Sequence, residues 1–355
     1  MFVRNSWYVA AWPEDIGHRE PFARTIIGEP LVFFRTKDGK VSAFDDRCPH
    51  RRMPLSLGRI TEDDKLICAY HGLTFDKEGT CVHVPGQPST HGIRVRSYPV
   101  VERWGFVWIW MGEPERADPA EIFDCNWLER AGWNRTKLYR HLKANYLLLN
   151  DNLSDLLHLA YLHLPSGIGN EHMGPAKTDL KVQDTGYHYV RETLDIPSPT
   201  VYGRLSNVKG NVDRWHVVDY KGPSFYIINT GIAQAGTGGP ESQLPEGQGR
   251  WSLGAHHLIT PETEKTTHYF KVNAHKWTLS SDSWRQINQV MEEDVWAIEN
   301  QQRNIDLRPE APTTPIPSDA PVFAMRKIVK AMVEAEAQPT DARPKSSARA
   351  PAVSA

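Results

Sequence analysis

The stretches Cys48-Pro49-His50 and Cys68-Ala69-Tyr70-His71 say more about this chain than any other part of its sequence. Each contributes one thiolate and one imidazole. Two cysteines and two histidines hold a Rieske [2Fe-2S] cluster, in which the cysteines bind one iron and the histidines bind the other. The two stretches therefore predict a one-electron carrier with the cluster ligands Cys48, His50, Cys68 and His71.

A structural zinc ion is the alternative for these four side chains, because the same atoms suit tetrahedral zinc. Zinc fingers usually place both cysteines in one pair and both histidines in the other, whereas each pair is mixed here. Strand-like runs at residues 41–44 and 65–67 precede the two pairs, and Gly72 permits a tight turn after His71. These features favour a Rieske cluster held by two loops between strands.

The size and charge of the chain set further limits. With 355 residues it is long enough for two domains with their own cores. Its 41 Lys and Arg residues nearly balance its 43 Asp and Glu residues, which gives no electrostatic reason to expect nucleic acid or a charged membrane surface as a partner. There is no run of about 20 apolar residues, and the first residues lack the apolar core of a signal peptide. We therefore expect a cytoplasmic protein without a membrane span.

Two further cysteines, Cys81 and Cys125, are not needed for the cluster. A disulfide between them is one alternative, but two reduced thiols are the better expectation for a cytoplasmic protein. We interpret Cys81, together with the aromatic residues between 104 and 110, as part of a β core.

Residues 1–112 have the pattern of a compact β domain. Short strand-like runs are joined by turns that contain Asp38-Gly39 and Glu78-Gly79. An aromatic run at residues 104–110 is predicted to be the last strand, and Gly112-Glu113-Pro114 ends it. This domain is expected to display both ligand loops.

Residues 113–335 have a mixed character. Residues 147–164 are apolar with helical periodicity, strand-like segments follow between about 178 and 275, and residues 282–303 and 323–336 are again helical in pattern. The predicted fold class is α+β: an N-terminal all-β Rieske domain and a C-terminal, helix-grip-like domain in which helices flank a mostly antiparallel sheet. Residues 336–355, rich in Ala, Pro and Ser, are predicted to form a disordered tail.

A second metal site is suggested by residues 152–163. Asp155 and His158 are three residues apart and would share a helix face. His158 and His163 are five apart, so they converge on one metal only if the helix widens into a π-bulge or ends before His163. Two histidines and a carboxylate form the facial triad of non-haem Fe(II). The late helix offers three carboxylates at residues 292–294, and periodicity does not choose among them.

With these motifs, the chain resembles the oxygenase component of Rieske non-haem iron oxygenases, and within them the vanillate O-demethylase group, which includes dicamba monooxygenase. The resemblance extends over about residues 1–335. It rests on both cluster motifs and on three further segments, residues 3–10, Asn152-Leu153-Ser154-Asp155-Leu156-Leu157-His158, and residues 258–263.

The resemblance implies roles for individual residues in the second domain. His158, His163 and Asp294 would bind the mononuclear Fe(II). Asp155 would connect that iron site to the Rieske histidine of a neighbouring subunit in a homotrimer, and Asn152 would either tune the iron pocket or be an ordinary polar helix residue. Asn229 and His257 would lie near the aromatic substrate, with the adjacent His256 as the alternative to His257. Arg204 and Arg214 could bind a carboxylate, although surface salt bridges explain arginines more often.

The implied function is O2-dependent O-demethylation of a methoxylated, vanillate-like aromatic acid to a phenol and formaldehyde. Electrons would come from an external NAD(P)H-dependent reductase or ferredoxin, because the chain lacks a Gly-x-Gly-x-x-Gly nucleotide fingerprint. The nearest alternative is hydroxylation of the methyl group or ring of an aromatic carboxylate or sulfonate. A Rieske electron carrier without mononuclear iron and a zinc-stabilised binding module are alternatives from other classes.

Overall fold

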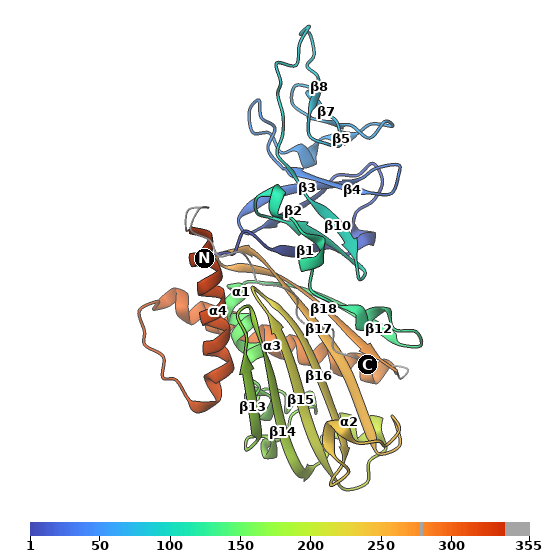
Figure 1. The fold of residues 1–355 in the computed structure, drawn as a ribbon, viewed down its shortest axis with the longest axis vertical. Coiled ribbons are helices and arrows are strands. Elements are labelled where there is room, and N and C mark those ends of the chain that lie inside the picture. The colour runs from blue at the N-terminus through green and yellow to red at the C-terminus, as the bar shows by residue number, and fades with distance from the viewer. Residues whose placement is uncertain (277–279, 338–355) are drawn as a thin grey trace.

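The structure of the chain is a computed structural model that describes residues 1–276 and 280–337. Two β-rich parts follow each other along the long axis of the molecule (Figure 1). The N-terminal part carries three small sheets, and the C-terminal part is built on one seven-stranded sheet with helices on one side. This is the α+β arrangement that the sequence predicts.

The N-terminal part contains sheets with the strand orders β1-β11-β10, β2-β3-β4-β9 and β5-β6-β7-β8. Its strands are β1 (Trp7–Ala11), β2 (Phe22–Ile26), β3 (Glu29–Arg35), β4 (Val41–Asp45), β5 (Arg59–Ile60), β6 (Leu66–Ile67), β7 (Thr74–Phe75), β8 (Cys81–His83), β9 (Ser97–Tyr98), β10 (Val100–Arg103) and β11 (Phe106–Trp110). The predicted turns at Gly39 and Gly79 join β3 to β4 and β7 to β8.

The aromatic strand begins later than predicted. Trp104 and Gly105 form the two-residue turn between β10 and β11, in which Arg103 pairs with Phe106. Both turn residues have positive φ, 59° and 78°, which is the geometry of a type I′ hairpin. The strand prediction for residues 104–105 was therefore wrong. The hairpin needs both residues in its turn, although tryptophan by itself favours strands.

The C-terminal part is organised by a fully antiparallel sheet with the order β12-β18-β17-β16-β15-β14-β13. The strands are β12 (Asn134–Leu142), β13 (Lys177–Val182), β14 (Gly186–Pro197), β15 (Asn211–Lys221), β16 (Phe225–Gln234), β17 (Arg250–Thr263) and β18 (Thr266–His275). The helices are α1 (Tyr146–Ser154), α2 (Thr200–Ser206), α3 (Ser281–Leu307) and α4 (Ala320–Ala337). None of the helices in the described part of the chain is both long and apolar enough to cross a membrane.

Both faces of the central strands are buried, each against a different layer. On β18, Tyr269 belongs to the core beneath the helices, whereas Phe270 belongs to an aromatic cluster shared with Trp7 and Trp108 of the N-terminal part. Successive side chains of a strand point to opposite faces. Odd-numbered residues of β17 and β18 therefore face the helix-covered side, and even-numbered residues face the N-terminal part.

The two parts are held together by hydrogen bonds as well as by this aromatic cluster. Thr260 Oγ1 donates to the carbonyl of Val9 over 2.7 Å, and the N–H of Ile27 donates to the carbonyl of Pro261 over 2.8 Å. The C-terminal end of α4 is also bonded to the N-terminal part, because the carboxylate of Glu336 accepts a hydrogen bond from the backbone N–H of Arg4. Residues 336 and 337 are thus helical and not part of a tail, and the remainder of the predicted tail lies outside the described residues.

Helix α1 is shorter than the helix predicted for residues 147–164. Asn145 caps its start by accepting a hydrogen bond from the N–H of Leu147, and the helix ends at Ser154. Asp155 then adopts an extended conformation, and its carboxylate accepts a hydrogen bond from the N–H of Leu157 over 2.8 Å. Aspartate side chains compete in this way with helix hydrogen bonds. The prediction that Asp155 and His158 share a helix face was therefore wrong.

Candidate metal centres

The two cysteine–histidine loops of the N-terminal part have the same backbone design. The N–H of Cys48 donates to Met53 and the N–H of Cys68 donates to Leu73, each over 2.9 Å. In both loops the cysteine carbonyl also accepts from the residue four positions on, Arg52 or Gly72. Both of these residues have positive φ, 58° and 73°. The predicted tight turn at Gly72 is present, and a matching turn at Arg52 was not anticipated.

This design places the four predicted cluster ligands on one side of the loops. Cys48 and Cys68 are buried next to each other, whereas His50 and His71 are exposed with ring centroids 4.5 Å apart. Burial and the neighbouring Cys68 raise the pKa of the Cys48 thiol to about 11. A bound metal reverses this, because coordination deprotonates a thiol. Two buried thiols and two outward imidazoles fit a [2Fe-2S] cluster with cysteine inside and histidine outside.

Cys81 and Cys125 are free and buried, as expected. Cys81 belongs to the same apolar cluster as Cys48 and Cys68. Cys125 belongs to the aromatic cluster between the two parts of the molecule. Neither thiol takes part in a disulfide.

A second group of metal-binding side chains lies between α1 and α3. The potential ligand atoms of His158, His163 and Asp294 all lie within 4.8 Å of one another. His163 Nε2 is 3.2 Å and His158 Nε2 is 3.6 Å from Asp294 Oδ1. Ligands about 2.1 Å from a common metal at right angles to each other are about 3 Å apart. The spacing therefore fits one mononuclear metal ion held by two histidines and a carboxylate.

The other nitrogen of each imidazole is already occupied, which directs both Nε2 atoms to the shared space. His163 Nδ1 lies 2.8 Å from Glu293 Oε2, and His158 Nδ1 contacts the backbone carbonyl of Asp155. Metal-binding histidines almost always have such a partner on the second ring nitrogen. Burial opposes ionisation of Asp294, but His163 and His158 outweigh it, so the pKa of Asp294 lies below its ordinary value. Asp294 is thus ready to bind a cation.

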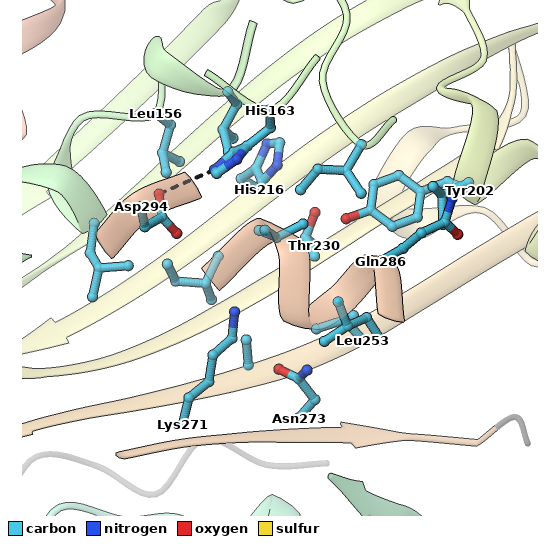
Figure 2. Close-up of a pocket in the computed structure, with 18 of the residues that line it drawn as sticks. Leu156, His163, Tyr202, His216, Thr230, Leu253, Lys271, Asn273, Gln286 and Asp294 are labelled. Carbon is cyan, nitrogen blue, oxygen red and sulfur yellow. Dashed lines mark ion pairs between the residues drawn. The ribbon is translucent and has the colours of Figure 1, made fainter. Parts of the chain in front are cut away.

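The three consecutive acids of α3 have three different environments. Glu292 is exposed and pairs with Arg140. Glu293 contacts His163, and only Asp294 points between the two histidines. Figure 2 shows the ion pair between His163 and Asp294 at one end of a cavity. Helix rotation of about 100° per residue separates the three side chains in this way, and packing of α3 against the sheet decides which of them faces inward.

Replacing Glu293 with alanine is expected to weaken iron binding about 10- to 100-fold, because His163 loses the carboxylate that orients and polarises it. Competition with an iron chelator measures this affinity. Glu292→Ala is the matched control, since it removes the neighbouring acid without touching the triad. Equal affinities for the two variants would contradict the role of Glu293.

Asn152 and Asp155 line different cavities. Asn152 lines the cavity, and its Nδ2 donates to Asp294 Oδ1 over 3.2 Å. Asp155 is half-buried and borders a different, surface cavity together with Arg191. Asp155 is also the residue expected to connect the iron site with the cluster of a neighbouring subunit. His158 Nδ1 contacts the backbone carbonyl of Asp155, while Asp155 Oδ1 accepts a hydrogen bond from the N–H of Leu157.

The cavity beside the triad is enclosed by α1, α2, α3 and the helix-covered face of the sheet (Figure 2). Aliphatic side chains from all these elements form most of its wall. They are Leu153, Leu156, Leu159, Ile168, Val201, Leu205, Ile228, Leu253, Ala255, Ile287 and Val290. Apolar walls with a few polar groups are typical of small-molecule sites.

Of the two residues predicted to contact substrate, one lines this cavity. His257 faces it, and its Nδ1 lies 2.5 Å from the hydroxyl of Tyr269. Asn229 does not line it, since the lining residues of β16 are its neighbours Ile228 and Thr230. Asn229 Oδ1 instead accepts a hydrogen bond from Trp215 Nε1. Strand alternation thus places Asn229 on the wrong face for the predicted role.

The same alternation separates His256 from His257 and identifies lining residues that sequence reasoning missed. His256 is buried on the other face of β17 and does not line the cavity. Lys271 and Asn273 of β18 do line it, and Lys271 stands opposite His257 in the strand register. The pairing of Lys271 with His257 would have placed Lys271 in the cavity, but it can be recognised only when the register of β17 and β18 is known. Arg214 also lines the cavity, whereas Arg204 is exposed outside it.

A small β domain with two mixed cysteine–histidine loops, joined to a helix-flanked sheet with a two-histidine, one-carboxylate triad, defines the oxygenase component of a Rieske non-haem iron oxygenase. Family models agree with this class. Residues 6–99 match the Rieske [2Fe-2S] domain, and residues 142–335 match the vanillate O-demethylase oxygenase C-terminal domain. The match to the Rieske model removes the zinc alternative.

Similar proteins cover almost the whole chain. A putative toluene-4-sulfonate monooxygenase system iron-sulfur subunit of Comamonas testosteroni is 37% identical, over 95% of this chain and 98% of its own length. A vanillate O-demethylase oxygenase subunit of a Pseudomonas strain is 33% identical, over 96% and 98% of the two chains. The crystal structure of dicamba monooxygenase bound to dicamba superposes with a TM-score of 0.82 at 30% identity, over 95% and 99%.

The chain belongs to the vanillate O-demethylase group of Rieske oxygenases. It is an oxidoreductase of the monooxygenase type, with a Rieske [2Fe-2S] cluster and a mononuclear non-haem iron as its cofactors. The prediction of the family, of the fold and of both cofactors is thereby confirmed.

Proposed function

We propose that the chain O-demethylates a methoxylated aromatic acid, giving a phenol and formaldehyde. The observation that carries this proposal is the apolar cavity that ends directly at the His158, His163 and Asp294 triad. A flat aromatic ring fits such walls, and one substituent then meets the metal site. Relatives named as a vanillate O-demethylase subunit and a dicamba monooxygenase support the reaction type.

We assign the metal ligands accordingly. Cys48, His50, Cys68 and His71 hold the cluster, and His158, His163 and Asp294 hold the iron. When bound, the iron and the cluster together supply O2 activation and single electrons.

The remaining groups of this chain bind, orient and exclude water. The aliphatic walls keep bulk water from the reacting carbon, and Asn152 holds Asp294 in place through its amide. His257 contacts the substrate from the sheet side. The overall reaction consumes one O2, two electrons and two protons, and converts the aryl methyl ether to a phenol, formaldehyde and water. The hydroxylated methoxy carbon is a hemiacetal, which collapses without further oxidation.

The electron partner is an external NAD(P)H-dependent reductase or ferredoxin, and the assembly is a homotrimer. The cluster loops border β5–β8, at the end of the molecule remote from α1 and α3 (Figure 1). A single copy therefore keeps its two metal centres apart. The exposed His50 and His71 are suited to meet the triad of a neighbouring copy, near the half-buried Asp155. We also propose that the protein works in the cytoplasm, where NAD(P)H is available to the reductase.

Residues 1–112 then form the Rieske domain and residues 113–335 form the catalytic domain. Three short 3₁₀ turns between Pro114 and Glu129 connect the last strand of the first domain to the first strand of the second. This connection contains no strand of the N-terminal sheets or of the seven-stranded sheet, which supports a domain boundary at its start.

Hydroxylation of an aryl methyl group is the second candidate, favoured by the similarity to toluene-4-sulfonate monooxygenase subunits. Both reactions hydroxylate a methyl carbon placed at the iron. They differ in what happens to that carbon afterwards. A methoxy carbon releases formaldehyde after hydroxylation, whereas a ring methyl group leaves a stable benzyl alcohol.

Assays with paired substrates separate these two functions. The purified protein with a suitable reductase is expected to release formaldehyde from a methoxybenzoate in a one-to-one ratio with the phenol. The matching methylbenzoate or 4-methylbenzenesulfonate should react more slowly. Faster formation of a benzyl alcohol from the methyl substrate, without turnover of the methoxy acid, would overturn the demethylation proposal.

A further inference from the structure

Lys271 is a buried lysine whose ammonium group has no hydrogen-bond or ion-pair partner among the described residues. It lies on the helix-covered face of β18 and is 9% exposed, and its side chain extends into the cavity (Figure 2). Lysines are almost never buried unless they are paired. Within the described part of the chain, no hydrogen bond or ion pair engages its Nζ, and burial lowers its pKa. The folded protein thus keeps a lysine side chain without a direct partner in a largely apolar cavity.

Asp294 does not neutralise this charge. Its carboxylate raises the pKa of Lys271 through space, but the same carboxylate accepts a hydrogen bond from Asn152 and lies between His163 and His158. A metal at the triad would engage Asp294 further. Lys271 therefore needs a different anion, and the space beside it is the substrate cavity.

Asn273 provides a second polar group at the same place. It is two residues further along β18 and points into the same cavity, as Figure 2 shows. Only 2% of Asn273 is exposed, and its Oδ1 is buried without a hydrogen-bond partner. Because the oxygen and nitrogen of a side-chain amide are assigned from their partners, this amide can present either a donor or an acceptor to a ligand.

Arg214, the other cation in the cavity wall, is already engaged. Its Nη1 donates to the carbonyl of Ile168 over 2.8 Å, and its guanidinium carbon lies 4.7 Å from the centre of the Tyr202 ring. Its Nη2 lies 3.3 Å from His216 Nε2, and its Nε is buried without a hydrogen-bond partner among the described residues. Arg214 therefore supports the cavity wall, while Lys271 remains available.

We propose that Lys271 binds the anionic group of the aromatic substrate, a carboxylate or a sulfonate, and that Asn273 contributes a hydrogen bond to the same group. This inference rests on the proposed function and adds the residue that makes it specific for acids. Anchoring the anion on β18 sets the orientation of the ring, and thus which substituent meets the triad. The charge pair is strong because it forms in a water-poor cavity.

The test is ligand binding to the iron-loaded protein without reductase, so that no turnover takes place. Calorimetry measures the dissociation constants of two acids, 3-methoxybenzoate and 4-methylbenzenesulfonate, and of their uncharged amides. The wild-type protein is expected to prefer at least one acid over its amide. Lys271→Met should raise the dissociation constant of that acid about 100-fold, which is the size of effect expected when one partner of a buried charge pair is lost. The dissociation constant of the amide should stay within about threefold of its wild-type value.

Two further variants make the result specific. Lys271→Arg keeps the charge and should retain the preference for the acid. Arg204→Met removes a nearby cation that bonds to the cavity-lining Gln286 but lies outside the cavity, and it should change neither constant. Equal losses for acid and amide in Lys271→Met, or a wild-type protein that binds amides as tightly as acids, would overturn the proposal.

Stability provides an independent readout. Because Lys271→Met removes an unpaired buried charge, the ligand-free variant should melt at the same temperature as the wild-type protein or higher. A clear decrease would mean that Lys271 has a structural role, and would also overturn the proposal. Acid binding that depends on Lys271 in a protein that releases no formaldehyde would refute the demethylation proposal alone.

Discussion

Replacing Asp294 with alanine should remove one of about three irons per chain and reduce turnover to background. Asp294 supplies the anionic ligand between the half-buried His158 and the buried His163, and is itself buried. Two neutral imidazoles alone do not complete the facial triad. The cluster is held by other residues, so its visible absorption should be unchanged. Iron analysis together with absorption spectra measures both effects.

The control for this variant is Glu292→Ala, two positions before Asp294 on the same helix. Glu292 pairs with Arg140 at the surface and should be replaced without loss of iron or activity. An Asp294→Ala protein that keeps about three irons and normal turnover would show that the mononuclear site lies elsewhere.

Replacing Cys68 with serine should remove the other two irons and leave the mononuclear iron in place. The cluster requires both buried thiolates, so its two irons and its visible absorption should be lost, and about one iron per chain should remain at the triad. Turnover supported by a reductase should stop, because electrons no longer reach the iron. The pair of variants thus assigns each iron to its own ligands.

Cys81 offers a close control for the Cys68 variant. Its thiol is equally buried and packs in the same apolar cluster, but it donates a hydrogen bond to the carbonyl of His83 and is not one of the four predicted cluster ligands. Cys81→Ser should retain the cluster. If it lost the cluster as completely as Cys68→Ser, disturbance of the apolar core, and not ligand loss, would explain both results.

Local chemistry explains which features could be predicted from the sequence. The ligand loops repeat one hydrogen-bonding pattern within six residues, so their identity depends on near neighbours alone. The same holds for the turns at Gly39 and Gly79, and for the start of α3, which was predicted to within one residue, although the helix continues four residues beyond its predicted end. The end of α1 was not predictable from periodicity, because one aspartate side chain replaced a helix hydrogen bond.

By itself, the sequence determined the types of both metal centres, because the number and kind of ligand atoms decide which metal chemistry is accessible. Periodicity left open which of three neighbouring acids meets the histidines, and the tertiary structure places Asp294 there, as the resemblance implied. Only the tertiary structure decided that Asn229 faces away from the cavity and that Lys271 faces into it. These outcomes depend on helix packing and strand register. A shift of one residue turns each side chain of a strand to the opposite face, and no short stretch of sequence contains that information.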